Sequence, residues 1–427
     1  MIQSQVREYF MLGYLIVALY WLLPVTLLTS HSLPSGVFYA LMLTALVLLV
    51  REQFSGIGAQ SRRYGWLIAG YSVLFSSVAA SSVYYGAWAG ANSEGALRMF
   101  LGLWVLLLAL PRVRRQVLQH ALWGVLVSCF VSTAVLLWLT FNVRARPLTP
   151  GVIITTYSSI MLLLGAVSVY SLKWRLSVFP RVEQVVKILA AVATFGGFLV
   201  AQTRTGLLGL PLFLILGIIL FVGINRPRRL FAVLGVSAVL LMAVVGSSDS
   251  LRYRVMEGVQ NVQTCQGEGS TYYSSMCIRL QLWRSAIDAG LSHPWVGLGD
   301  GGRYHDYLRD VAVPKGLVSQ RVVDEGFGEP HNDVMLVFAG FGFPGALGLL
   351  LIYLIPCFYF VPRLLRRDVS MQARAAAAMG LATCLGFALF GLTEMMFRRM
   401  NTMGFYVAFV ALFMVLSDCK FRQREDH

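Results

Sequence analysis

Residues 333–361 read DVMLVFAGFGFPGALGLLLIYLIPCFYFV. After Asp333 the stretch runs for 28 residues without a charged side chain. An α-helix needs about 20 apolar residues to cross a bilayer core roughly 30 Å thick. The stretch therefore predicts a membrane-spanning helix, and with it an integral membrane protein.

Similar apolar runs recur along the chain. Of its 427 residues, 57% are hydrophobic and 13% are charged, whereas about 25% of the residues of a soluble domain are charged. We predict an all-α integral membrane protein with about twelve transmembrane helices. The predicted spans are residues 10–28, 36–50, 65–84, 98–110, 117–140, 151–170, 185–201, 206–222, 230–245, 333–361, 375–391 and 402–416.

The basic residues of the short connections predict the orientation, because Lys and Arg are enriched in cytoplasmic loops. With the N-terminus inside, 21 basic residues fall on the cytoplasmic side and six on the other. The six are Arg98, Arg144, Arg146, Arg204, Arg398 and Arg399. We therefore expect both termini in the cytoplasm. This asymmetry accounts for the net charge of +15, so we expect no binding of nucleic acid.

One long loop, residues 246–330, separates predicted helices 9 and 10 and is expected outside the cell membrane. It divides the chain into 1–245, 246–330 and 331–427. Ile278, Leu282 and Ala286 fall at helical spacing, and Ser292-His293-Pro294 ends that predicted helix. A loop of this length is usually functional or disordered. Cys265 and Cys277 lie in it, and a disulfide between them is plausible in an oxidising compartment.

The turn AQTRTG, residues 201–206, joins two predicted spans on the outer side. A helix that begins at Gly206 presents backbone N–H groups and the positive end of its dipole there, which favours an anion. Arg204 adds a full charge and a planar fork that suits phosphate or diphosphate. The alternative is an arginine that extends to the membrane interface.

The segment from Glu329 through Pro330, His331 and Asn332 to Asp333 precedes the helix quoted first. Pro330 is well placed to open that helix. The helix dipole and nearby arginines disfavour the charged form of His331. A neutral imidazole can act as a general base. The alternative is a histidine that only caps the helix or lies at the interface.

Other features exclude some classes of protein. The predicted helix centres hold almost no ionisable residues, which disfavours a proton-coupled transporter. Residues 297–302 match GxGxxG, but no strand precedes them, so turn-forming glycines are the better interpretation. The loop carboxylates, such as Asp300 and Asp306, show no tight ligand spacing. We expect neither a metal site nor a cofactor.

Several motifs together resemble the O-antigen ligase and polymerase superfamily. They are Arg279-x-x-x-Trp283-x-x-Ala286, Pro294-x-x-Gly297-x-Gly299, Pro330-His331-Asn332-Asp333, and Gly340-x-Gly342-x-Pro344-Gly345. The turn Gln202-Thr203-Arg204-Thr205-Gly206 is similar to that superfamily's Ser/Thr-Arg-Thr/Gly element. With the helix count, the resemblance covers nearly the whole chain.

The resemblance implies an inverting, metal-independent glycosyltransferase at the outer face of the bacterial inner membrane. Such a ligase moves O-antigen from undecaprenyl diphosphate to a lipid A–core acceptor. His331 would be the catalytic base, and Arg204 and Arg279 would bind the diphosphate. Arg284 and Arg303 lie close enough to take the role of Arg279. Possible supporting residues are Arg144, Arg146, Glu329 and Asp333.

Two other functions stay open. An O-antigen polymerase, which extends the same lipid-linked glycan, would share the donor, the motifs and the topology. A translocator of lipid-linked glycans without chemistry is of another class, and the charge-free helix centres disfavour it.

Overall fold

The structure is a computed structural model. It describes residues 2–418 except 55, 87–90, 143–147, 202, 204, 224–227, 229–231, 233–234, 236–255, 257–264, 266–274, 300–302, 367 and 398, and the side chains of residues 2–10 and 91–92 are also not described. Arg144, Arg146 and Arg204 therefore lie outside the described residues.

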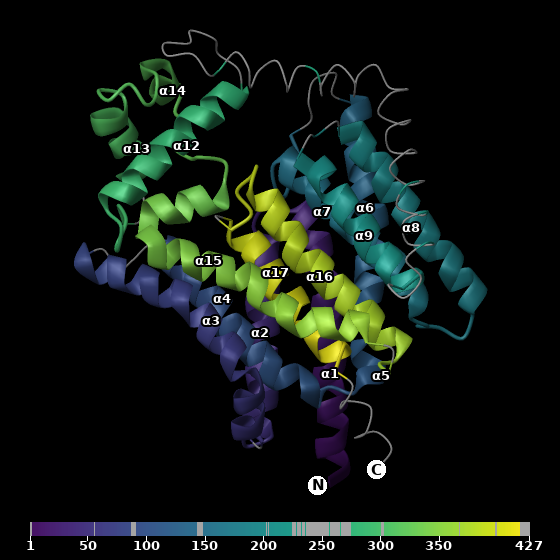
Figure 1. The fold of residues 1–427 in the computed structure, drawn as a ribbon. Coiled ribbons are helices and arrows are strands. Elements are labelled where there is room, and N and C mark those ends of the chain that lie inside the picture. Colours follow the sequence, from purple (N-terminus) through teal and green to yellow (C-terminus); the bar gives the residue numbers. More distant parts are fainter. Residues whose placement is uncertain are drawn as a thin grey trace.

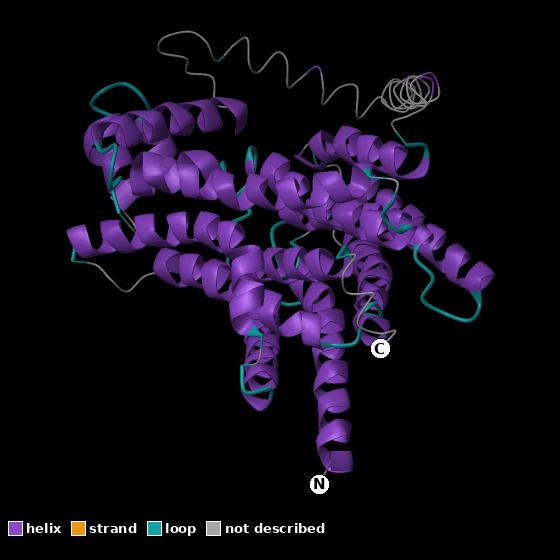
Figure 2. Cartoon of the chain, turned by 60° about the horizontal axis from the view of Figure 1, so that its bottom comes forward, coloured by secondary structure: helices purple, strands orange, loops and turns teal. Residues whose placement is uncertain are grey.

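The described part of the chain is helical, without strands (Figure 2). Its longer helices are α1 (Ile2–Thr29), α2 (Leu33–Arg51), α3 (Ile57–Tyr84), α4 (Ala91–Ala109), α6 (Ala121–Asn142), α7 (Ile154–Tyr170), α8 (Pro180–Ala201), α9 (Gly209–Phe221), α12 (Ser275–Ser292), α15 (Asp333–Leu365), α16 (Met371–Gly391) and α17 (Met400–Leu416). The shorter ones are α5 (Arg115–Leu118), α13 (Arg303–Tyr307) and α14 (Gln320–Asp324).

Eleven of the predicted spans coincide with described helices. Over the described ranges, nine helical segments are long and apolar enough to cross a membrane, and Thr205–Phe221 and Met400–Leu416 are shorter apolar helices. All of the predicted span 230–245 except residues 232 and 235 lies outside the described residues. The prediction of an all-α, multi-span membrane protein is confirmed. The predicted span 206–222 corresponds to Thr205–Phe221, whose first turn, Thr205–Leu208, is a 3-10 helix that leads into α9 at Gly209.

The centre of the helical bundle is α17. From Thr402 to Leu416 every side chain of this helix is buried, and it packs against α1, α2, α4 and α16 (Figure 1). The segment contains no charged residue, so this burial costs no desolvation of charge. Its position fixes the connection between α16 and α17, which carries part of the site described below.

The long helix α15 breaks at Gly342, whose φ of 64° and ψ of −160° are not helical. The break takes Phe343 N–H away from Ala339, and Pro344 has no N–H to donate to Gly340. Two backbone carbonyls inside the helix are thereby left without their helical donors. Buried carbonyls need partners.

The loop after α12 supplies those partners. Leu298 N–H donates to the carbonyl of Ala339 and Gly299 N–H to that of Gly340, both at 2.8 Å. Phe343 N–H in turn donates to Pro294 O at 2.8 Å. The glycines of the two sequence motifs therefore let two backbones meet, and this contact fixes α12 against α15.

We expect Gly342→Ala to destabilise the protein strongly. A Cβ at Gly342 would lie 2.2 Å from Pro294 O, on a residue whose φ is +64°. Steric overlap and a left-handed backbone would act together, at a cost of several kcal/mol. Thermal unfolding in detergent should show a large drop in Tm. The control Gly36→Ala adds a Cβ on α2 with nothing within 4 Å, and it should leave Tm unchanged or slightly higher.

The described part of the long loop is ordered around its own apolar cluster. Ile278, Leu282 and Ala286 are buried there, as their spacing predicts, and α12 ends at Ser292 as expected. Figure 1 shows α12, α13 and α14 grouped beside α15. Cys265 and Cys277 form a disulfide, with Cα atoms 5.3 Å apart.

Candidate active site

The N-terminus of α15 positions His331. Asn332 is the N-cap residue: its side-chain oxygen accepts from Val334 N at 3.0 Å and from Met335 N at 3.1 Å. The expectation that Pro330 opens the helix was wrong, because the helix begins at Asp333. His331 therefore lies just outside the helix and does not cap it. Its φ of 49° is left-handed, a conformation that non-glycine residues adopt mostly where the surroundings enforce it.

The connection between α16 and α17 is held against this helix start. Asp333 is 1% exposed, and its carboxylate accepts from Met396 N at 3.1 Å, Phe397 N at 3.0 Å and the Tyr353 hydroxyl at 2.9 Å. Asn332 Nδ2 donates to Leu392 O at 3.0 Å. Asp333, a possible supporting residue, thus fixes the backbone around Glu394 and has no accessible surface for a substrate.

Glu394 lies between an arginine and the histidine. Its Oε1 is 3.1 Å from Arg279 Nη2, and its Oε2 is 3.9 Å from His331 Nδ1. The Glu394 side chain is 3% exposed, against 23% for Arg279 and 29% for His331. A distance of 3.9 Å is too long for a direct hydrogen bond. It is nevertheless short enough for Glu394 to favour the tautomer of His331 that carries its proton on Nδ1.

The helix α12 brings Arg279 to this place. Trp283, one turn further along α12, donates its indole N–H to Pro330 O at 2.7 Å. That bond ties α12 to the residue before His331. Three segments, from α12, from the start of α15 and from the α16–α17 connection, thus meet at the Arg279–Glu394–His331 cluster.

The surroundings keep His331 neutral. Burial lowers the pKa of His331 below its ordinary 6.5, and the positive charge of Arg279 lowers it further. The predicted direction is confirmed, although burial is the larger cause. Nδ1 of His331 is buried and has no hydrogen-bond partner among the described residues. The exposed surface of the ring therefore belongs to its other atoms, which include Nε2.

A cavity of about 500 Å³ opens beside the cluster. His331 and Glu394 line it, together with Glu329 and Arg399. Its lining also includes His31, from the connection between α1 and α2, and Ile153, the residue before α7. The cavity therefore offers a neutral imidazole and a guanidinium to one bound molecule.

The remaining predicted residues lie as follows. Arg303 does not line the cavity; its guanidinium lies 4.1 Å from the centre of the Tyr85 ring and donates to Leu298 O at 3.3 Å. Two described neighbours of Arg204 are hydrogen-bonded to α7: Thr203 to Ser158 at 2.6 Å and Thr205 to Ser159 at 3.5 Å. These bonds lie near the N-terminal end of α7. The helix begins directly after Ile153, which lines the cavity.

Sequence reasoning missed Glu394. It is an isolated acid between two apolar runs, and no local spacing connects it with Arg279 or His331. The arginines at 398 and 399 close behind it were noted only as outward positive charges. An acid beside two arginines between two spans is a weak signal that could have drawn attention to this connection.

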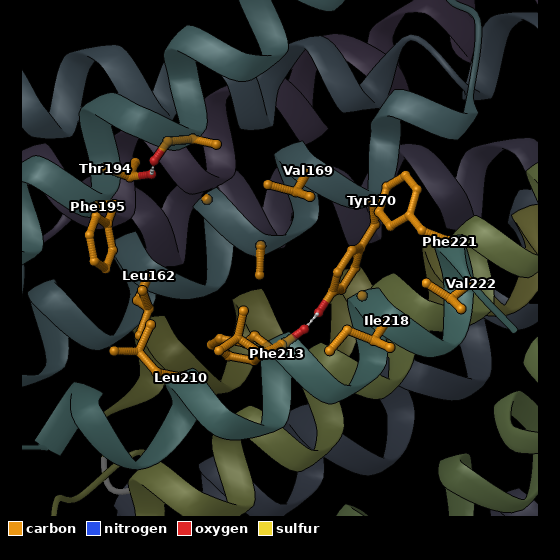
Figure 3. Close-up of a pocket in the computed structure, with 15 residues that line it drawn as sticks. Leu162, Val169, Tyr170, Thr194, Phe195, Leu210, Phe213, Ile218, Phe221 and Val222 are labelled. Atoms are coloured by element: carbon orange, nitrogen blue, oxygen red, sulfur yellow. Dashed lines mark hydrogen bonds between the residues drawn. The ribbon is translucent and has the colours of Figure 1, made fainter. Parts of the chain in front are cut away.

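An apolar groove of about 440 Å³ runs between α7, α8 and α9. Figure 3 shows Leu162, Phe195 and Leu210 at one part of it, and Tyr170 and Phe221 at another. The Tyr170 hydroxyl donates to Phe213 O at 2.6 Å, so its polar atom is satisfied. The groove follows α9, which leads away from the turn that contains residue 204.

Among the described residues, no three His, Cys, Asp or Glu side chains lie close enough together to hold a metal ion. The candidate site is thus a histidine with a carboxylate and arginines, in a multi-span helical membrane protein. That combination suits proton transfer next to an anionic group.

Comparison with known families finds a match for part of the chain. Residues 189–350 match the family model described as O-antigen ligase. The match includes Arg204, Arg279 and His331, and it confirms the predicted resemblance to the O-antigen ligase and polymerase superfamily. It indicates activity of the O-antigen ligase or polymerase type. A comparison with curated proteins finds no significant match.

Proposed function

We propose that the protein is an O-antigen ligase, an inverting glycosyltransferase that uses no metal ion. Its donor would be O-antigen linked to undecaprenyl diphosphate, and its acceptor a sugar hydroxyl of lipid A–core. The observation that carries this proposal is the Arg279–Glu394–His331 cluster, of which Glu394 and His331 line the cavity. A ligase needs a base for the acceptor and positive charge for the donor, and in this cluster His331 and Arg279 can supply them.

The reaction is a single displacement. The acceptor oxygen forms a bond to the anomeric carbon from the face opposite the diphosphate, and the bond from that carbon to the phosphate oxygen breaks with its electron pair. Nε2 of His331 takes the hydroxyl proton. The products are glycosylated lipid A–core and undecaprenyl diphosphate, and the anomeric configuration is inverted.

Each group has a physical reason for its role. Negative charge grows on the departing diphosphate, and Arg279 and Arg204 would stabilise it without a metal. As a proton arrives on His331, the Glu394 carboxylate stabilises the imidazolium, as a carboxylate does for histidine in other enzymes. Glu329 and Arg399 line the same cavity and would contact the sugars or the diphosphate. Arg303, Arg144 and Arg146 stay candidates for the approach of the anionic donor.

The groove between α7, α8 and α9 would hold the polyprenyl chain of the donor. Its lining is almost wholly apolar, and it follows α9 away from the turn with Arg204. A diphosphate bound at that turn therefore places its lipid tail at the groove.

We expect Gly217→Leu to raise the KM for the lipid-linked donor about ten-fold. The new side chain would enter the groove and displace about two isoprenoid carbons, each worth ~0.8 kcal/mol. A Cβ at Gly217 meets only Tyr170, at 3.4 Å, so the helix itself is not strained. Gly196→Leu is the matched control, because this α8 glycine faces open space. Kinetics with varied donor would detect the change. Equal KM values for both variants would show that the polyprenyl tail does not bind in this groove.

The proposed location is the bacterial inner membrane. Both termini would lie in the cytoplasm, and the His331 cavity would face the periplasm, where lipid-linked O-antigen and lipid A–core meet. The asymmetry of 21 basic residues against six supports this orientation.

Deletion of the gene, followed by gel analysis of lipopolysaccharide, tests the function. For a ligase, finished O-antigen chains remain on undecaprenyl diphosphate and the core stays bare. Core that carries a single repeat would identify a polymerase instead. An unchanged gel would contradict both activities.

A further inference from the structure

A second polar pocket lies at the ends of α7 and α16 that are opposite the candidate active site. It has a volume of about 660 Å³ and is lined by Arg115, Gln119, Arg175, Val178 and Gln372, among others. Its place follows from two helices. From the His331 cavity, α7 runs to Tyr170, and α16 runs from Met371 in this pocket to Gly391, close to Glu394. We call it the Arg115–Arg175 pocket.

A buried ion pair fixes one wall of the pocket. Lys187 is 0% and Glu183 3% exposed, and their charged atoms are 2.5 Å apart. Glu183 accepts from Leu176 N at 2.9 Å and from Ser177 N at 2.7 Å. Lys187 donates to Trp174 O at 2.7 Å and to Ser171 O at 2.8 Å. A buried ion pair is costly unless its hydrogen-bonding groups have partners. Here the partners are backbone groups of the short loop that carries Arg175.

The other wall is held through Trp174. Its indole N–H donates to Gln119 Oε1 at 2.8 Å, and the guanidinium of Arg115 lies 5.2 Å from the centre of its ring. Arg115 also donates to Leu416 O at 3.1 Å. Gln119 and Arg115 are therefore fixed in position before any ligand arrives, which lowers the entropic cost of binding.

The charge of the pocket favours an anion. Two arginines line it, and none of its lining residues is acidic. The nearby acids of the described chain are engaged elsewhere: Glu183 with Lys187, Asp368 with Arg366, and Asp418 with Arg63. Guanidinium groups and amide N–H donors together are well suited to the oxygens of a phosphate group.

Apolar side chains beside the pocket point to a lipid. Val178 lines the pocket and is 75% exposed; Phe179, just before α8, and Val182, in its first turn, are 69% and 62% exposed. An exposed apolar strip next to a cationic pocket matches an amphiphile with an anionic head. A free phosphate ion would use only the pocket.

We propose that the Arg115–Arg175 pocket binds the phosphate headgroup of an anionic phospholipid, with its acyl chains along the first turns of α8. The pocket lies on the side of the protein where 21 basic residues of the short connections are expected. In membrane proteins such a basic side faces the cytoplasmic leaflet and its anionic lipids. The site would anchor and orient the helices α7, α8 and α16 from the side opposite the chemistry.

Native mass spectrometry on delipidated protein tests the proposal. Phosphatidylglycerol should bind at least about ten-fold more tightly than phosphatidylcholine of the same chain length. Arg175→Gln should abolish most of that preference, because it removes one of the two positive charges that line the pocket. Arg175 is exposed, so its loss should leave the buried ion pair intact. Val178→Glu, which adds a negative charge at the rim, should weaken phosphatidylglycerol in the same way. Arg181→Gln removes an exposed arginine outside the pocket and should change nothing.

Three outcomes would overturn the proposal. The first is equal binding of the two lipids, and the second is an unchanged preference in both pocket variants. The third is a phosphatidylglycerol affinity no higher than that of inorganic phosphate, which would make the pocket a site for a free anion. His331→Asn should bind lipid like the wild type, so failure of the proposed catalytic function would leave this result unaffected.

Discussion

His331→Asn should reduce the rate of glycan transfer about 10²- to 10⁴-fold, the usual contribution of a positioned general base. Asparagine tolerates the left-handed backbone that His331 adopts, with φ of 49°. The variant should therefore fold normally, with the Tm of the wild type. Donor binding should also be retained, because the lost interaction acts mainly in the transition state. Single-turnover rates with purified protein would measure the change.

The pH dependence gives an independent test of the same role. Burial and Arg279 lower the pKa of His331, so the imidazole stays neutral and basic through neutral pH. The transfer rate should fall only as the pH drops through a value below 6.5, where the imidazole becomes protonated. That acidic limb should be absent in His331→Asn. Transfer at the wild-type rate by a folded His331→Asn protein would remove histidine from the mechanism.

Arg279→Gln should lower kcat/KM about 10- to 100-fold, the second largest effect. A hydrogen bond to a charged group is worth about 1.5–3 kcal/mol, and the variant also leaves buried Glu394 without its arginine. The main change should be weaker donor binding. Arg279→Lys should restore only part of the activity, because lysine lacks the planar fork.

Arg284→Gln is the matched control for this experiment. Arg284 lies on the same helix but is exposed, and it should change donor binding little. Donor titrations of both variants would decide between them. If Arg284→Gln lost most of its donor binding while Arg279→Gln bound donor normally, the diphosphate site would have to be assigned to Arg284 instead of Arg279.

The sequence predicted the parts of the fold whose signal is local. An apolar run is visible in the sequence without knowledge of its tertiary contacts, and eleven predicted spans coincide with described helices. In the same way, the spacing of Ile278, Leu282 and Ala286 predicted α12. The glycines of residues 297–302 were interpreted as turn-forming, and those of 340–345 entered only through the family resemblance. Their actual role, the pairing of the loop with the broken helix at Gly342, depends on contacts between distant segments.

The site was predicted only in part for the same reason. His331 carries a local signal, a histidine beside a helix start. Glu394 lies 115 residues from Arg279 in the sequence, and only the folded bundle brings them together. Asp333 was expected to support the chemistry, but three buried hydrogen bonds engage its carboxylate. Which acid is structural and which faces the cavity is decided by packing, which no spacing in the sequence reveals.

The most direct test of the account is a reconstituted reaction. Purified protein would be incubated in EDTA with O-antigen on undecaprenyl diphosphate and with lipid A–core, and the product analysed by mass spectrometry and NMR. We expect glycosylated lipid A–core, one undecaprenyl diphosphate released per transfer, and inversion at the new glycosidic bond. Glycan that lengthens on undecaprenyl diphosphate, a retained configuration, or activity that returns only when a divalent cation is added would contradict it.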